Sequence, residues 1–219
     1  MATYKDLVGS YANKTGAQLR IKSMISTRVV EFPAFLTNIS QDFKSSWNTE
    51  TVYGRMDPIA TFQNTTRTIS LGWNVPAATV AEAKANHGKF STLSQMLYPA
   101  YLKSTETQTV TQDDALDLAN ESSQIIETSS RTMSKPPLVR VRFGNIVCSQ
   151  DGTKGLLGWI DGISYKPTLT LGMFTSGGGN FYAKNFELSF TFNVLHDEDL
   201  GIDSSNGEWL DKNNSFPFK

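Results

Sequence analysis

Two histidines and one cysteine are the side chains best suited to metal or nucleophilic chemistry in this chain. His87 lies in a stretch with helical spacing, and His196 follows a stretch of strand-like alternation. Neither has a second histidine or a cysteine at the spacing that metal sites use. The acids at 197–199 that follow His196 could hold a cation loosely, but the pattern favours a solvated acidic turn. Cys148 lies among strand-like residues, where a small buried side chain is the ordinary role. We therefore predict no metal site and no catalytic cysteine.

Sequence motifs for other reactions are also missing. There is no Gly-x-Ser-x-Gly nucleophile elbow and no phosphate-binding Gly-x-x-x-x-Gly-Lys-Ser/Thr loop. The glycines at 177–179 precede no helical pattern that would present a phosphate site. A Ser-His-Asp triad is compatible with the sequence, because its members can lie far apart along a chain. We predict a protein without cofactor or catalytic site, with a dispersed active site as the alternative.

Five aromatic residues are candidates for stacking on a sugar ring. Trp73, Trp159 and Tyr165 lie in strand-like patterns, and we expect both tryptophans in the core. Trp47 and Tyr53 lie in an irregular polar segment, where a core position and an interface position are equally compatible with the pattern. A β-sandwich module that binds carbohydrate is therefore an alternative of a different class.

Charge and composition exclude several kinds of partner. The formal net charge of −1 argues against a protein that holds nucleic acid through phosphate contacts. A single cysteine allows no internal disulfide and fits a reducing cytoplasm. The first residues lack the basic and apolar pattern of a signal peptide, and no apolar run approaches the ~20 residues that span a membrane. We expect a protein made in the cytoplasm without membrane contact.

Alternation of apolar and polar residues predicts a mainly β fold. One amphipathic helix is expected over 79–98, because Thr79 and Glu82 form a capping box and Pro99 ends the pattern. The expected strands and extended segments cover residues 19–30, 39–54, 69–75, 139–143, 157–165, 168–171 and 186–194. The predicted fold is an antiparallel β-sandwich or barrel with one flanking helix.

Residues 104–134 differ from the rest of the chain. Twelve of these thirty-one residues are Ser or Thr, and six acids accompany one base, Arg131. Such a segment buries little apolar surface, so we predict a long exposed insertion with a short helix near 113–127. The expected organisation is an N-terminal arm at 1–18, a β domain at 19–199 that carries this insertion, and a C-terminal tail at 200–219.

The stretch from Phe43 to Ile59, which contains Trp47-Asn48, Tyr53-Gly54-Arg55 and Asp57-Pro58, leads into the strand at Thr66–Trp73. This arrangement resembles baseplate and tail-tube-like structural proteins of phages with contractile tails. The following helix, polar insertion, Pro-Pro and closing strand fit the same layout. The resemblance covers roughly residues 25–195.

The resemblance implies a tail-tube-like fold of two packed antiparallel sheets with a flanking helix. In such families six copies form a ring, whose strands combine into an inner barrel around a channel for passing DNA. The acidic insertion and the long arms favour a tube initiator or adaptor at the baseplate over a repeating major tube subunit, which remains an alternative. The expected partners are other copies and neighbouring tail-tube and baseplate proteins, within a virion assembled in the bacterial cytoplasm.

The same resemblance places a subunit interface around the segment that carries it. We expect Trp47, Tyr53, Arg55 and Asp57 to contribute to that interface. For Arg55 and Asp57, an ordinary local turn pair is the alternative role.

Overall fold

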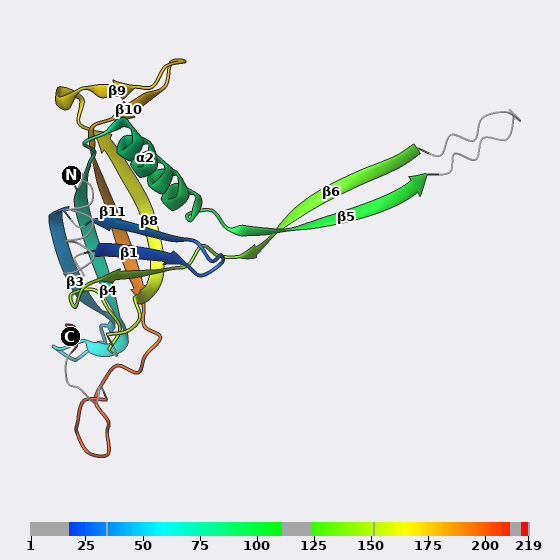
Figure 1. Ribbon diagram of the computed structural model, residues 1–219. Coiled ribbons are helices and arrows are strands. Elements are labelled where there is room, and N and C mark those ends of the chain that lie inside the picture. The colour runs from blue at the N-terminus through cyan, green and yellow to red at the C-terminus, as the bar shows by residue number, and fades with distance from the viewer. Residues whose placement is uncertain (1–17, 34, 111–123, 151, 211–215, 219) are drawn as a thin grey trace, which may run out of the picture.

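The computed structural model describes residues 18–33, 35–110, 124–150, 152–210 and 216–218. The predicted arm at 1–18 therefore lies outside the described residues except for Gln18. Strands and one helix make up nearly all of the regular structure (Figure 1). The elements are β1 (Gln18–Ser23), β2 (Val29–Pro33), β3 (Phe35–Glu50), β4 (Ile59–Pro76), α2 (Val80–Gln95), β5 (Ala100–Val110), β6 (Gln124–Lys135), β7 (Val139–Phe143), β8 (Leu156–Pro167), the 3₁₀ turn η1 (Leu169–Leu171), β9 (Met173–Thr175), β10 (Phe181–Ala183) and β11 (Asn185–Leu195).

Seven strands form one antiparallel sheet in the order β2-β1-β7-β8-β11-β4-β3. In β11 the side chains alternate between buried and half-buried along the whole strand. This is the pattern expected when one face of a sheet packs on the core and the other faces outward. The predicted mainly β fold with one flanking helix is confirmed.

The sheet curls on itself instead of forming two separate sheets. Phe32 of β2, at one end of the strand order, packs against Trp73 of β4 with 5.5 Å between ring centroids. Trp73 also packs edge to face on Phe190 of β11 at 5.4 Å. All three side chains are buried, and Trp73 is 0% exposed. The core thus lies between the β1-β2-β7 layer and the β4-β11 layer, and the sheet does not close into a barrel.

Helix α2 covers one end of this core. The side chain of Thr79 accepts a hydrogen bond from the Glu82 backbone N–H at 3.2 Å, and Glu82 accepts one from the Ala78 N–H at 2.9 Å. The first bond satisfies a donor of the first turn, as the capping box predicts, and the second ties Glu82 to the residue before the N-cap instead of to the N–H of Thr79. On the domain side, Phe90 stacks on Tyr165 of β8 with 4.6 Å between centroids. The helix is therefore fixed both at its start and against the sheet.

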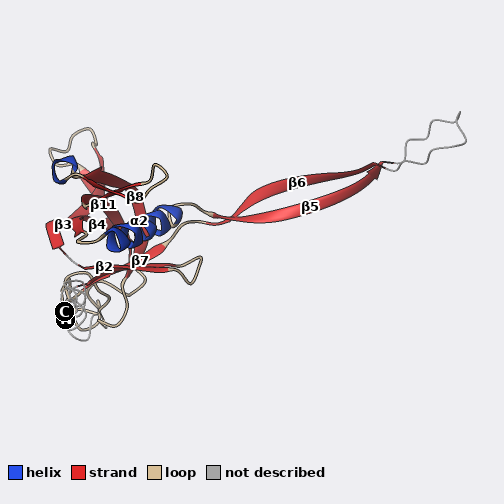
Figure 2. Cartoon of the chain, turned by 45° about the horizontal axis from the view of Figure 1, so that its top comes forward, coloured by secondary structure: helices blue, strands red, loops and turns tan. Residues whose placement is uncertain are grey.

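The predicted insertion begins with a long β-hairpin. Strands β5 and β6 pair from Ala100 with Lys135 to Val110 with Gln124, and both views show them leading away from the domain (Figures 1 and 2). The helix predicted near 113–127 is wrong for 124–127, which lie in β6, and its remaining positions lie outside the described residues. Alternating backbone hydrogen bonds let a Ser- and Thr-rich sequence form strands without a core. We call the β5–β6 hairpin the arm.

Two further expectations differ from the structure. The alternation at Leu169 and Leu171 predicts a strand, but these residues form η1, and both side chains are exposed. Trp159 was expected in the core, yet it is 40% exposed, because it lies between the buried Gly158 and Ile160 and so points to the outer face of β8. Two alternating residues are too short a pattern to separate a strand from a tight turn.

Candidate assembly surfaces

The outer face of strands β8, β11, β4 and β3 is a polar wall. Residues directly opposite each other in an antiparallel pair point to the same face. The register therefore aligns rows of small polar side chains across all four strands. One row is Gly162, Thr191, Ser70 and Ser40, and the next is Ser164, Ser189, Gly72 and Asn38. We call this surface the polar face.

Hydrogen bonds join the polar face across three strands. Thr68 of β4 donates to Asn193 Oδ1 of β11 at 3.1 Å, and Asn193 Nδ2 donates to Asp161 Oδ2 of β8 at 2.6 Å. Trp159 Nε1 completes the chain by donating to Asp161 Oδ1 at 2.9 Å. A shallow hollow of about 570 Å³ lies beside this chain, over Gly72 and the neighbouring serines. The face is thus fixed in shape and hydrophilic.

Charges on the polar face nearly cancel. Two lysines and three acids point to this face, which gives a formal sum of −1 (2 − 3). The strand register places four of these side chains on the face: Lys44, Lys166, Asp42 and Glu187. The fifth, Asp161, is placed there by its hydrogen bonds with Trp159 and Asn193. The face therefore offers no positive field to attract a polyanion.

Both sides of this four-stranded wall carry unpaired backbone groups. Strand β3 ends the sheet and pairs only with β4. Strand β8 pairs with β7 only over Leu156–Gly158, so the stretch 159–167 has no strand beside it on that side within the described part of the chain. Unpaired strand edges in monomers are usually short, bent or charged. Two long free edges on one sheet are typical of a surface that pairs with another chain.

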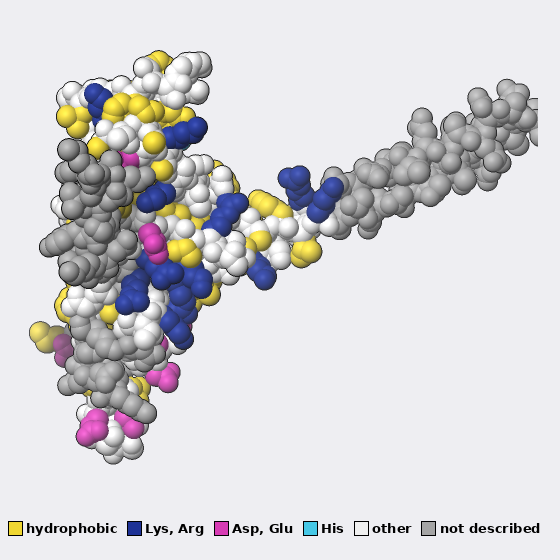
Figure 3. Space-filling model, in the orientation of Figure 1, with side chains coloured by type: hydrophobic (Ala, Val, Ile, Leu, Met, Phe, Trp, Pro, Cys, Tyr) yellow, Lys and Arg dark blue, Asp and Glu magenta, His cyan; other side chains and the backbone are white. Residues whose placement is uncertain are grey.

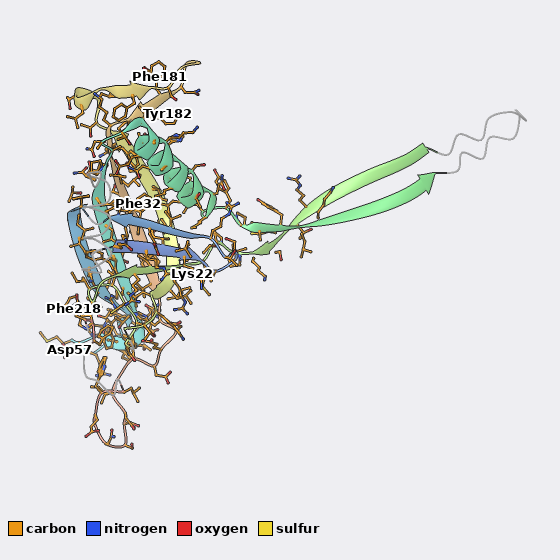
Figure 4. The ribbon with its side chains drawn as sticks, in the orientation of Figure 1. Lys22, Phe32, Asp57, Phe181, Tyr182 and Phe218 are labelled. Carbon is orange, nitrogen blue, oxygen red and sulfur yellow. The ribbon has the colours of Figure 1, made fainter. Side chains whose placement is uncertain are left out.

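The residues predicted at an interface lie on or near the β3–β4 turn. Trp47 is 54% exposed and packs edge to face on Phe62 with 5.3 Å between centroids. Tyr53 is fully exposed in the turn, and Figure 4 places Asp57 at the same end of the domain. Neither Arg55 nor Asp57 forms an ion pair within the described residues. The structure thus brings these residues to one exposed end of the sheet, and their role in an interface stays a prediction.

Exposed apolar side chains gather at both ends of the long strands. The lower end carries Val52, Tyr53, Met56 and Ile59 around the β3–β4 turn. The opposite end carries Leu169, Leu171, Met173 and Phe181 around the β9–β10 hairpin, where Figure 4 labels Phe181 far from Asp57. The sequence pattern did not indicate this second patch, because its residues lie in short irregular pieces. Exposed apolar clusters of this kind are typical of contact surfaces.

A small cavity lies beneath the C-terminal segment. It is lined by two of the three side chains considered above for metal or nucleophilic chemistry. Cys148 and His196 both line it, together with Arg67. Its volume of about 30 Å³ has room for one or two water molecules. Burial and the charge of Arg67 lower the pKa of His196, partly offset by Asp197. No cluster of three metal-binding side chains occurs among the residues the structure describes.

Arg67 is a buried cation held by neutral groups. Its guanidinium donates to Gln41 Oε1 at 2.5 Å and to the Pro217 carbonyl at 3.4 Å. The rings of Phe43 and Phe216 lie 5.3 and 5.5 Å from it, within the range of cation–π attraction. Burial lowers the pKa of Arg67 to about 10, so it stays charged at neutral pH. Arg67 therefore fastens the C-terminal segment to the base of the β3–β4 hairpin.

Replacing Arg67 with alanine is expected to release that segment. The change removes one hydrogen bond and one cation–π contact to residues 216–217, each contributing roughly 1 kcal/mol. The two losses sum to about 2 kcal/mol, and about 1.4 kcal/mol already corresponds to a tenfold larger open population. Carboxypeptidase should then remove the C-terminal residues about tenfold faster, whereas the exposed control Arg55→Ala should leave the rate unchanged. Equal trimming of wild type and Arg67→Ala would show that Arg67 does not hold the segment.

Comparison with known proteins gives a distant similarity among solved structures. No protein-family description matches the sequence, and no curated protein matches it. Among solved structures, the chain is similar to one in the cryo-electron microscopy structure of the anti-feeding prophage baseplate, which was sixfold symmetrised. The match has 8% identity and a TM-score of 0.28, and it covers 80% of this chain and 87% of that chain. At these values the similarity carries no argument about fold or function, so both follow from the chain's own geometry.

No described helix is long and apolar enough to cross a membrane.

Proposed function

We propose that this chain is a non-catalytic structural subunit of a phage-like tail. Six copies would form a ring that starts or adapts the tail tube at the baseplate and extends its DNA channel. The observation that carries the proposal is the polar face with a free strand edge on each side. The resemblance of residues 25–195 to tail-tube-like proteins points in the same direction.

The strand directions suit a closed ring. Successive strands from β8 through β11 and β4 to β3 are antiparallel, so β3 runs opposite to β8. Rotation about an axis along these strands preserves their directions. The β3 edge of one copy can then pair antiparallel with residues 159–167 of β8 in the next. A closed barrel leaves no free edge, which removes the tendency of both edges to aggregate.

In this arrangement the polar face lines the channel. A channel for DNA must let phosphates pass without holding them, and strong binding to phosphates comes from clustered lysine and arginine. The polar face instead combines serine, threonine and asparagine with charges that sum to −1 (two lysines, three acids). Its composition therefore supports passage of DNA without sequence-specific contacts.

The two apolar ends suit contacts along the tail axis. The β3–β4 turn, with Tyr53 and Met56, and the β9–β10 hairpin, with Phe181, lie at opposite ends of the strands that would form the channel wall. One end would meet a tail-tube protein and the other a baseplate protein. If each end instead met another copy, the contact would repeat without closing and produce a tube.

The mass of the purified full-length chain tests this proposal. Native mass spectrometry and electron microscopy should show closed rings of fixed copy number, alone or with tail partners. Open-ended tubes of this chain alone would favour the alternative, a repeating major tube subunit. A chain that stays monomeric at every concentration and never joins a tail particle would contradict both.

A further inference from the structure

The outer face of strands β1 and β7 is strongly basic. In the register of these strands, Arg20 lies opposite Arg142 and Lys22 lies opposite Arg140. Lys154, just before β8, is also exposed. Lysine and arginine side chains gather over this region beside the base of the arm, where Figure 4 labels Lys22 (Figures 3 and 4). We call the surface formed by Arg20, Lys22, Arg140, Arg142 and Lys154 the basic face.

Like charges directly opposite each other destabilise a sheet, so acidic partners are needed to offset the charge of the basic face. Two of its residues have such a partner: Arg20 pairs with Glu31 at 3.2 Å and Arg140 with Asp197 at 2.6 Å. Arg142 donates only to the neutral carbonyl of Thr153, and Lys22 has no acceptor within the described residues. Positive charge therefore remains on this surface when the chain is alone.

The matching negative charge is concentrated in residues 104–134 of the sequence. Residues 104–134 contain six acids and one base, a formal charge of −5 (1 − 6). Because the whole chain carries −1, all other residues together carry +4 (−1 + 5). The acids are Glu106, Asp113, Asp114, Asp117, Glu121 and Glu127. The chain is thus divided into an acidic segment, residues 104–134, and a basic remainder, which includes Lys103 and Lys135 at the base of the arm.

The direction of the arm carries β5 and β6 away from the basic face of the same copy. Strands β5 and β6 lead outward from the end of α2, away from β1 and β7, in both ribbon views (Figures 1 and 2). Their eleven-residue and twelve-residue lengths carry the chain roughly 35 Å at about 3.3 Å per residue. Opposite charges at that separation are screened at physiological salt.

We propose that the basic face is a docking site for the acidic segment 104–134 of a second copy of this chain. The contact joins surfaces of opposite sign, and each copy supplies one arm and one basic face. It uses neither the free strand edges nor the polar face, so it does not depend on the ring proposed above. Within an assembly, this contact would join each subunit to a further neighbour, in addition to the one whose strand edge it pairs with.

Carbodiimide crosslinking of mixed isotopes tests this contact. The reagent joins carboxylates to lysine amines, so full-length chain with natural nitrogen is mixed with ¹⁵N-labelled chain at low salt. The expected products join Lys22 or Lys154 of one isotope to an acid of residues 106–127 of the other. Because the attraction is between exposed charges, these products should decrease about tenfold between 0.05 and 0.5 M salt.

Charge-changed variants decide whether the basic face itself is responsible. Lys22→Glu combined with Arg142→Glu should reduce the mixed-isotope products at Lys154 at least about tenfold, whereas the matched change Lys84→Glu on α2 should not. Asp113→Asn with Asp114→Asn and Asp117→Asn should have the same effect from the acidic segment 104–134. The edge-blocking proline of β3, whichever of Lys44→Pro and Ser45→Pro melts like the wild type, should leave the products intact, which separates this contact from the ring.

Three results would overturn the proposal. The first is crosslinks that join only residues of the same isotope. The second is undiminished crosslinking in both the basic-face and the arm variants. The third is binding of duplex DNA to the basic face with no crosslink to the arm, which would assign this surface to nucleic acid instead.

Discussion

Proline at one of two neighbouring positions in β3, Lys44 or Ser45, is expected to abolish assembly of this chain. Consecutive residues in a strand direct their N–H groups to opposite sides. One of these two N–H groups therefore faces β4, and the other faces the free edge. Proline on the free side removes a donor and places its ring against the incoming strand. Loss of several hydrogen bonds of about 1 kcal/mol each should weaken ring formation at least about 100-fold.

The two variants control each other. The proline that faces β4 breaks a hydrogen bond of the sheet and should lower the melting temperature, whereas the other should melt like the wild type. Sedimentation velocity then compares the assembly of the well-folded variant with that of the wild type. If the variant with an unchanged melting temperature forms rings as readily as the wild type, β3 is not the pairing edge.

Gly158→Ala is expected to be the most destabilising small substitution in the sheet. A Cβ at this position would lie 2.0 Å from the Asn193 carbonyl oxygen and 2.8 Å from the Phe192 ring. The backbone of β8 or β11 must move to relieve this overlap, which should cost about 3 kcal/mol or more. For a chain of this size, the melting temperature should decrease by roughly 6–12 °C.

The position of Gly158 connects this stability effect to assembly. Residues 156–158 of β8 pair with β7, and the free edge begins at the next residue. A shift of β8 at Gly158 would therefore also move the edge that we propose pairs with a neighbouring β3. Rings should form less readily even below the melting temperature of the variant.

Gly162→Ala is the matched control for this effect. It lies on the same strand, but a Cβ there meets nothing within 4 Å. Differential scanning calorimetry should find its melting temperature within about 2 °C of the wild type, consistent with an effect of about 0.5 kcal/mol. Similar melting of both alanine variants would show that the close approach of β8 to β11 at Gly158 is not required.

The regular strands and the helix were predictable because local pattern decides them. The alternation at 186–194 and 69–75 places one face of each strand in the core, and both segments are central strands of the sheet. Thr79 and Glu82 predicted the start of the helix, because a cap depends only on residues three apart. The extended segment predicted at 39–54 largely coincides with β3, which shifts register between Ser46 and Trp47.

The surfaces proposed for assembly were harder to predict because they depend on tertiary register. The polar face forms only when β8, β11, β4 and β3 lie side by side, and the sequence does not specify that order. The burial of Arg67 depends on Phe216 and Pro217, which lie far from it along the chain. The composition of 104–134 predicted an exposed insertion but not the strands at 104–110 and 124–134, because threonine-rich polar segments suit both loops and strands.

Electron cryo-microscopy of the assembled full-length chain tests the central claim most directly. We predict a closed ring in which β3 of each copy pairs antiparallel with residues 159–167 of the next. Ser70, Ser164 and Thr191 should then face the channel. A closed assembly in which the polar face is covered by another subunit or points outward would contradict the account.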